Sequence, residues 1–539
     1  MVPFRLLLMI GGVLLVGSGV AHAATPEKDS EALAARIDRH LTAAWEVNKV
    51  QPAPPASDAE FLRRVYLDLA GRIPAVAEVR AFLDDTRSDK RRRLVEHLLE
   101  GPRYVTHFTN VWRALLLPES TNNVQTSFLA PGFESWLHGK LQQNAPYDAM
   151  VRELLTLPMD GPSRNAFGPA NGTPTPIAFY LAKEVKPENV AAAVSRLFLG
   201  VKIECAQCHD HKFADWKREQ FWSFAAFFAG LQRQGNGDFV NVGREVANRR
   251  ELTIPGTEHK VQAVFLDGTQ PNWKNNTNPR ATLAEWMTRK DNPYFARAAV
   301  NRIWGYFFGS GIIDPVDEIA GGEHEASHPE LLDELARQFA EHNFDLKYLI
   351  RAITASCAYQ LSSLATHTSQ DDPRLFARMP LRGLSAEQLF DSIAQATGYR
   401  EEMNTNQRGF FGNTSARSRF ITRFANASDR PTEVQTSILQ ALSMMNGQIT
   451  AASTDLEHSE TLTALLDAPF MDTAERVQTI SLAVLSRKPT PRELSSLVGY
   501  VEKGGSAGDT SADKDKNYHR ALADVFWVLL NSGEFFLNH

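Results

Sequence analysis

The sequence predicts a mainly α-helical protein with two helical lobes joined by a small β-containing segment. Three observations lead to this fold class. Apolar residues recur at helical spacing along most of the 539-residue chain. Glycine and proline stand at the ends of these patterns, where they stop or open helices. Between residues 233 and 279 the helical pattern gives way to short stretches bounded by Asn, Gly and Thr, which indicate strands.

The first 23 residues have the features of a secretory signal peptide. Arg5 provides the positive charge, an apolar run follows over residues 6–20, and Ala21-His22-Ala23 has the small-residue pattern of a cleavage site. The apolar run is short for a helix that spans a membrane. We therefore expect an exported protein of the periplasm or cell surface, with its mature start near Ala24 and no integral membrane segment after cleavage. An uncleaved anchor is the alternative.

The rest of the chain divides into four parts by pattern. Residues 24–56 form an N-terminal segment with a Pro-rich linker, residues 57–232 a first helical domain, residues 233–279 the β-containing junction, and residues 280–539 a second helical domain. Within them, apolar periodicity and helix-end residues predict the following elements. Helices are expected at residues 58–70, 75–83, 89–100, 104–117, 133–141, 147–157, 187–199, 216–230, 281–289, 294–308, 330–342, 346–359, 386–397, 432–445, 460–466, 473–485, 491–501 and 518–530, and strands at 251–255 and 260–266.

Charge and motif content exclude several functional classes. The formal net charge is −6, so the chain has no overall positive field to attract nucleic acid. It contains no P-loop, no dinucleotide-binding glycine pattern and no G-x-S-x-G nucleophile elbow. Whether the protein is an enzyme is left open by its sequence.

One short stretch carries the strongest chemical signal. Cys205, Cys208 and His209 have the C-x-x-C-H spacing of covalent c-type haem attachment. Each thiol would add to one haem vinyl group, and His209 would be the proximal ligand of the haem iron. The same spacing also suits a zinc site, a redox pair or a structural clip. His211 is a possible second ligand or outer-shell residue, and Asp210 a possible outer-shell carboxylate.

The surroundings of this stretch leave its ligand set open. Residues 216–230 are dense in aromatic side chains, which would suit either a haem face or an ordinary aromatic core. Six residues are candidates by type for the sixth iron ligand: Met159, Met403, Met444, Met445, His259 and His324.

Further residues have alternative interpretations. His324 to His328 match H-E-x-x-H, but Pro329 places the motif on a loop, which disfavours a metalloprotease. Residues 314–318 group three carboxylates that could bind calcium, although a solvated turn is the simpler interpretation. Arg297, Asn301 and Arg302 could contact carboxylates or cap neighbouring helices. Cys357 lies in an apolar helical pattern and is expected to be buried.

Several longer segments resemble a known pair of domains. The sequence Phe61 to Pro74, the C-x-x-C-H stretch and residues 224–228 resemble the planctomycete cytochrome-type domain of unknown function. Segments of the second half resemble the planctomycete C-terminal partner domain of unknown function that usually follows it, namely residues 292–304, 327–333, 359–363, 487–491 and 530–539. The resemblance implies an exported two-domain protein and implies no settled activity.

Three functions are compatible with these signals. The first is a c-type haem protein for electron transfer or another redox role, which would need a redox partner protein. The second is an extracytoplasmic metal-dependent enzyme that uses zinc or calcium, with ligands among His209, Asp210, His211 and the carboxylates of residues 314–318. The third is a non-catalytic binding or scaffold protein in which Cys205 and Cys208 form a clip.

Overall fold

The computed structural model describes residues 26–121, 123–159, 174–210, 215–235, 241–273, 278–320, 325–399, 415–424, 459–506 and 513–539. The expected signal peptide and the helix expected at 432–445 lie outside these residues. Within them the fold is mainly α-helical, as predicted, and the strands form small two-stranded antiparallel sheets. Among the described helices, none combines the length and apolar character needed to cross a membrane.

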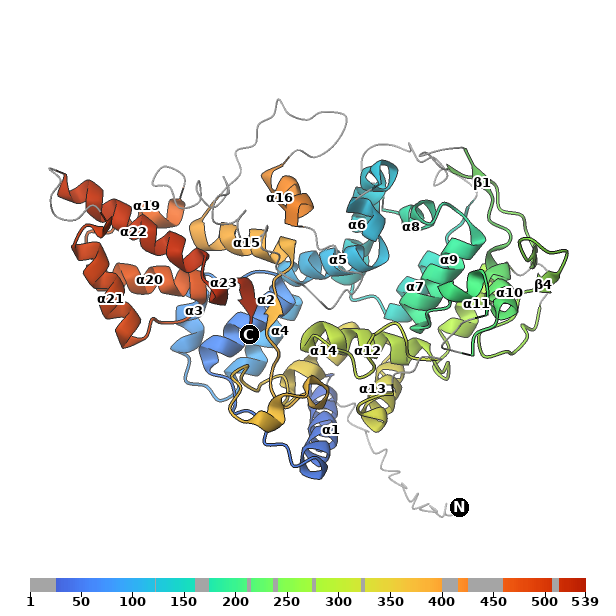
Figure 1. Ribbon diagram of the computed structural model, residues 1–539, viewed down its shortest axis with the longest axis horizontal. Coiled ribbons are helices and arrows are strands. Elements are labelled where there is room, and N and C mark those ends of the chain that lie inside the picture. The colour runs from blue at the N-terminus through green and yellow to red at the C-terminus, as the bar shows by residue number, and fades with distance from the viewer. Residues whose placement is uncertain are drawn as a thin grey trace, which may run out of the picture.

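Helices make up most of the described chain, and longer connections separate α7 from α8, α10 from α11 and α14 from α15 (Figure 1). Their bounds are α1 Pro26–Val47, α2 Asp58–Ala70, α3 Val76–Leu83, α4 Lys90–Glu100, α5 Pro102–Leu116, α6 Val124–Gln142, α7 Tyr147–Leu155, α8 Ile177–Ala182, α9 Pro187–Val194, α10 Arg218–Ala225, α11 Pro279–Met287, α12 Phe295–Phe308, α13 Pro329–Glu341, α14 Leu346–Ala355, α15 Ala386–Thr397, α16 Ala416–Phe424, α19 Glu460–Leu466, α20 Thr473–Leu485, α21 Pro491–Glu502, α22 Lys514–Leu530 and α23 Gly533–Phe536. The strands are β1 Arg233–Gln234, β2 Asn241–Val242, β3 Glu251–Thr253, β4 Lys260–Gln262, β5 Arg382–Gly383 and β6 Leu537–Asn538.

Local capping explains many of the helix ends. The Ser57 side chain accepts a hydrogen bond from the backbone N–H of Glu60 and so caps the start of α2. Gly71 ends α2 in the left-handed conformation, at φ 69°. Helix α10 differs from expectation, because it ends at Ala225 and continues only as the 3₁₀ turn Ala226–Phe228 (η5).

The apolar side chains form two cores. The larger core draws on residues 33–379 together with Leu482, so it contains helices from both sides of the 233–279 segment. The smaller core combines α15, α16 and α19–α23 with Leu67 and Ile73 from the start of the chain. The chain therefore passes from the larger core to the smaller core near residue 380, just before β5. The β-rich segment lies at one edge of the larger core, against α10 and η5.

Segments that are distant in sequence meet at α2. In Figure 1 the early helices α2 and α3 lie beside the late helices α20 and α23, and α20 contacts α3. The last strand, β6, pairs with β5 and also contacts α2. At the opposite end of the molecule, α7–α11 and β4 gather far from α19–α22. The C-x-x-C-H stretch belongs to this second end.

Candidate functional site

The two cysteines lie on one exposed turn. Cys205 belongs to the short 3₁₀ turn Glu204–Gln207 (η4), and Cys208 follows it directly. Both thiols are free and exposed, and His209 is exposed as well. Between the cysteines, Ala206 is fully buried and fixes the inner side of the turn in the larger core. The turn thus presents two thiols and an imidazole to solvent from a fixed base.

Helix α10 fixes the backbone of this turn. The buried indole of Trp222 donates a hydrogen bond from Nε1 to the carbonyl oxygen of Gln207 at 3.0 Å. Arg218 Nε donates to the same carbonyl at 3.4 Å. A carbonyl that accepts two hydrogen bonds from one helix keeps the turn in a defined position, which pre-organises the side chains beside it.

Asp210 links the imidazole to the start of α10. The carbonyl oxygen of Asp210 lies 2.8 Å from Nδ1 of His209. A carbonyl can only accept, so Nδ1 carries the proton and Nε2 of the neutral ring keeps its lone pair. The carboxylate of Asp210 accepts the backbone N–H of Arg218 at 2.9 Å. This hydrogen bond, with the charge of Lys217, holds the pKa of Asp210 below its ordinary value.

The described residues do not form a metal site. Among them, no three side chains of His, Cys, Asp or Glu are grouped closely enough to hold a metal ion. The set of Cys205, Cys208 and His209 therefore does not converge on one point, as a zinc site requires. Covalent haem attachment has no such requirement, because the thiols bond to the porphyrin edge and only the imidazole reaches the iron. His211 lies outside the described residues.

The aromatic side chains near the turn pack into the protein. The ring of Phe227 stacks on Phe265 with centroids 5.1 Å apart, and Phe265 stacks on Trp286 at 4.7 Å. Phe221, Trp222, Phe224 and Phe228 are buried in the same core. These rings therefore form an aromatic core, which is one of the two interpretations of residues 216–230.

The carboxylates of residues 314–318 lie near the segment that leads into the turn. Val201 forms an isolated antiparallel bridge with Glu318, and Ile319 donates its N–H to Gly200 at 2.8 Å. The carboxylate of Asp317 pairs with Arg302 at 2.5 Å. This acidic segment therefore supports the backbone before Cys205 by packing and ion pairing.

The other candidate residues have structural partners or lie elsewhere. Asn301 exchanges two hydrogen bonds with the backbone of Ile313, and Arg297 pairs with Asp333. His328 stands at the N-cap of α13, which confirms that this end of the H-E-x-x-H match lies outside a continuous helix. Met159 is buried. His324, Met403, Met444 and Met445 fall outside the described residues.

Cys357 is not buried, in contrast to the expectation from its apolar pattern. Helix α14 ends at Ala355, so Cys357 lies just beyond the helix and is exposed. Its backbone N–H donates to Asp38 Oδ1 at 2.7 Å and its Sγ to Oδ2 at 3.1 Å. Partial burial, with the Asp38 carboxylate beside it, raises the pKa of the Cys357 thiol to about 11.

Comparison with family models assigns both halves of the chain. Residues 36–233 match PSCyt2, described as a protein of unknown function (DUF1549), and residues 279–501 match PSD1, described as a protein of unknown function (DUF1553). The chain has the PSCyt2–PSD1 two-domain arrangement. No curated protein and no solved structure matches it. The C-x-x-C-H turn lies near the end of the PSCyt2 match.

The PSCyt2 and PSD1 domains are joined through a buried carboxylate that sequence reasoning did not single out. Asp68 of α2 is 1% exposed. Its carboxylate accepts hydrogen bonds from Tyr359 Oη at 2.8 Å and from Asn538 Nδ2 at 2.7 Å. Arg382 Nη2 donates to both of its oxygens, at 2.8 and 3.0 Å. One PSCyt2 side chain thereby binds two PSD1 residues and the last strand.

Two adjacent arginines of α2 extend this joint toward the C-terminal segment. Arg63 donates to the carbonyls of Val484 at 3.0 Å and Phe535 at 2.9 Å. Arg64 donates to the carbonyl of Tyr359 at 2.5 Å. Both guanidinium groups are fully buried. The sequence signal for this role was present, because the charges at positions 63 and 64 interrupt the apolar face of an otherwise buried helix.

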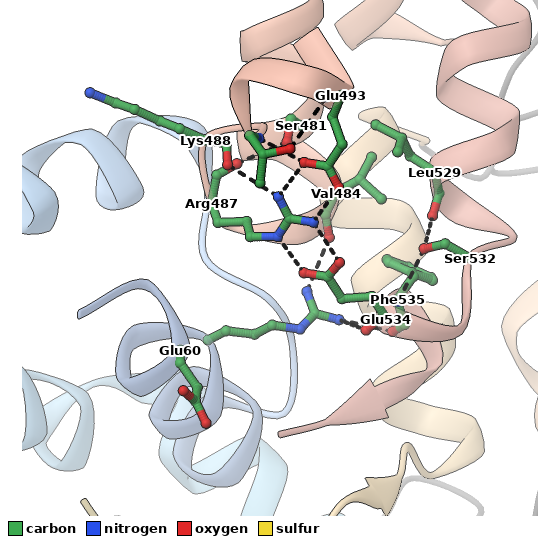
Figure 2. A network of polar contacts seen from close by, with 12 residues as sticks. Glu60, Ser481, Val484, Arg487, Lys488, Glu493, Leu529, Ser532, Glu534 and Phe535 are labelled. Carbon is green, nitrogen blue, oxygen red and sulfur yellow. Dashed lines mark hydrogen bonds and ion pairs between the residues drawn. The ribbon is translucent and has the colours of Figure 1, made fainter. Parts of the chain in front are cut away.

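Arg487 of the PSD1 domain belongs to the same network and binds two carboxylates. Figure 2 shows its guanidinium between the carboxylates of Glu493 and Glu534, with a pair of hydrogen bonds to each at 2.6 to 3.0 Å. The backbone carbonyl of Glu534 also accepts from Arg63 Nη2 at 3.3 Å. The segments that carried the family resemblance, around residues 61–74, 359–363, 487–491 and 530–539, therefore meet in one network.

Proposed function

We propose that this PSCyt2–PSD1 protein is an exported c-type haem protein with a redox or electron-transfer role. Cys205 and Cys208 would carry the thioether links, and His209 would bind the iron through Nε2. Each link forms by addition of S–H across a vinyl C=C bond, which consumes no oxidant. A bound haem would supply one-electron chemistry, and a redox partner protein would exchange that electron.

The state of the His209 ring is the observation that carries this proposal. The hydrogen bond from Nδ1 to the carbonyl of Asp210 leaves Nε2 as the metal-binding atom. Ligating histidines commonly donate their other N–H to a carbonyl or carboxylate in this way. Because Asp210 is tied to α10 through the N–H of Arg218, the imidazole is oriented before any ligand binds. Both thiols beside it are free to react.

Among the described residues, Cys205, Cys208 and His209 do not form a zinc site by themselves. Zinc would need the two thiolates and the imidazole to approach one centre, and the described residues form no such group. A clip between Cys205 and Cys208 would involve only the two thiols and would not use the oriented ring of His209. Haem attachment uses the two exposed thiols and the oriented ring together.

The test is expression of the full chain with the haem-attachment machinery of the bacterial periplasm. We expect a Soret band that persists in the denatured protein, because thioether bonds survive unfolding. Replacement of both Cys205 and Cys208 by serine should abolish it, whereas Cys357→Ser should not. A colourless wild-type protein, with or without stoichiometric zinc by elemental analysis, would contradict the proposal.

Export has its own test. Mass spectrometry of the protein recovered from the periplasm should show an N-terminus near Ala24 if residues 1–23 are a cleaved signal peptide. If the chain is expressed with residues 1–23 and is recovered at full length from the cytoplasm, that result would argue against export.

A further inference from the structure

A small hairpin lies against the same end of α10 as the C-x-x-C-H turn. Strands β3 and β4 pair antiparallel, with Leu252 opposite Val261. The backbone N–H of Ile254 donates to the carbonyl of His259 at 2.9 Å and closes the connection between the strands. Both strands contact α10. The hairpin, residues 251–262, comes from the segment between the PSCyt2 and PSD1 matches.

Arg218 connects this hairpin to the turn. Its Nη2 donates to the carbonyl of Pro255, at the tip of the hairpin, at 2.6 Å. Its Nε donates to the carbonyl of Gln207 in the turn at 3.4 Å. The rigid, forked guanidinium can reach two carbonyls at once, and a lysine ammonium on a flexible stem cannot reproduce that geometry. The side chain of Arg218 therefore links the Cys turn to the tip of the hairpin.

The next residue of α10, Glu219, contacts the other side of the hairpin tip. Glu219 Oε1 lies 3.5 Å from Nε2 of His259. Asp210, on the turn, binds the backbone N–H of Arg218 within the same first turn of the helix. The hairpin tip and the exposed imidazole of His209 thus flank one helix end.

We propose that Arg218 is a positioning residue that holds the 251–262 hairpin as a cover beside the haem on Cys205 and Cys208. This inference rests on the proposed function. A cover of this kind excludes water from one side of the haem. Water stabilises the more highly charged ferric state, so exclusion of water raises the reduction potential. The cover also slows the entry of small external ligands to the iron.

The decisive variant is Arg218→Lys in the haem-loaded full chain. It keeps the positive charge and the backbone N–H that binds Asp210, and it removes the guanidinium that links Pro255 to Gln207. We expect a lower midpoint potential and faster binding of added imidazole, with the rate increased on the order of tenfold, the usual size of an outer-shell effect. Arg289→Lys, in an exposed pair with Asp291, is the matched control and should change neither quantity.

A second measurement does not depend on haem. In the haem-free protein, limited proteolysis should cut the hairpin tip at residues 255–259 faster in Arg218→Lys than in the wild type. Equal cutting rates would show that Arg218 does not hold the hairpin in place. If Arg218→Lys carries haem with the midpoint potential and imidazole-binding rate of the wild type, the hairpin does not cover the haem. The proposed function would still stand. A wild-type chain that carries no haem would overturn both.

Discussion

Arg382 donates two hydrogen bonds from one nitrogen to the carboxylate of Asp68, across the join between the PSD1 and PSCyt2 domains. The two residues are 314 positions apart in the chain, and Asp68 is almost completely buried. Tyr359 and Asn538 bind the same carboxylate. A buried charge with this many partners is costly to disturb, because each partner would be left unsatisfied.

Asp68→Asn should destabilise the protein strongly. The amide has one oxygen where the carboxylate has two, and it leaves the positive charge of Arg382 buried without its counter-charge. We expect a loss of about 3–5 kcal/mol, the usual cost of breaking a buried pair on one side. The measurement is the midpoint of urea-induced unfolding. Asp291→Asn removes an exposed carboxylate paired with Arg289 and should shift the midpoint little.

Gly71→Ala should also destabilise the fold, by more than about 2 kcal/mol. Gly71 has φ +69°, and an added Cβ would lie 2.3 Å from Nδ1 of the buried His107 ring. The matched variant is Gly499→Ala, inside α21, where a Cβ would meet no atom within 4 Å. That change should raise stability by up to about 1 kcal/mol, because alanine favours helix. Equal effects of the two variants in thermal unfolding would contradict the contact with His107.

Stability should fall as the pH drops below neutrality, in part through His107. Tyr306 donates its hydroxyl hydrogen to the carbonyl of Asp68 at 2.7 Å, so it accepts the proton of His107 Nε2, also at 2.7 Å. Burial lowers the pKa of His107 from 6.5 to about 4. The unfolded chain therefore binds a proton at higher pH than the folded chain does.

The contribution of His107 is complete above pH 6.5 and is lost progressively as the pH falls toward 4. It amounts to at most about 1.4 kcal/mol per pH unit in that window. His328 has its pKa lowered in the same direction, also to about 4 by burial, so the wild-type slope contains both groups. His107→Gln should reduce the slope of unfolding free energy against pH, whereas His97→Gln, on the exposed side of α4, should leave it unchanged.

Arg487→Lys should weaken the attachment of the C-terminal segment. The guanidinium makes paired hydrogen bonds to Glu493 and Glu534, and a lysine can offer only a single point charge. Because Arg487 is partly exposed, we expect a loss of about 1 kcal/mol. Arg337→Lys, in an exposed set of pairs on α13, is the control and should cost less in the same urea titration.

The same arginine predicts an acid-dependent effect. Its hydrogen bonds lower the pKa of Glu493 from 4.5 to about 2. The stabilising contribution of Glu493 is therefore present above pH 4.5 and is lost as the pH falls toward 2. Arg487→Lys should reduce this loss, and an unchanged acid limb of the stability curve would show that the pair does not contribute.

Local patterns in the sequence determined where the helices lie. Helices α15, Ala386–Thr397, and α20, Thr473–Leu485, have the bounds that apolar spacing predicts, because Ser385 and Asp472 cap them with side-chain hydrogen bonds to residues three positions on. Helix α10 is shorter than its pattern, because burial of Phe227 and Phe228 against residues outside the helix is not encoded in periodicity. The C-x-x-C-H spacing and the two-domain resemblance were likewise visible in the sequence alone.

Only the tertiary structure decided how these elements are joined. The partners of Asp68, at Tyr359, Arg382 and Asn538, are about 290 to 470 residues away. Hydrogen bonds over such separations leave no periodic signal, so Asp68 looked like an ordinary residue of an amphipathic helix. The orientation of His209 also needed the structure, because its contact with Asp210 depends on the backbone conformation of an irregular turn. The sequence placed its imidazole beside two thiols, and folding brought the start of α10 to Asp210 and thereby directed which ring nitrogen is free.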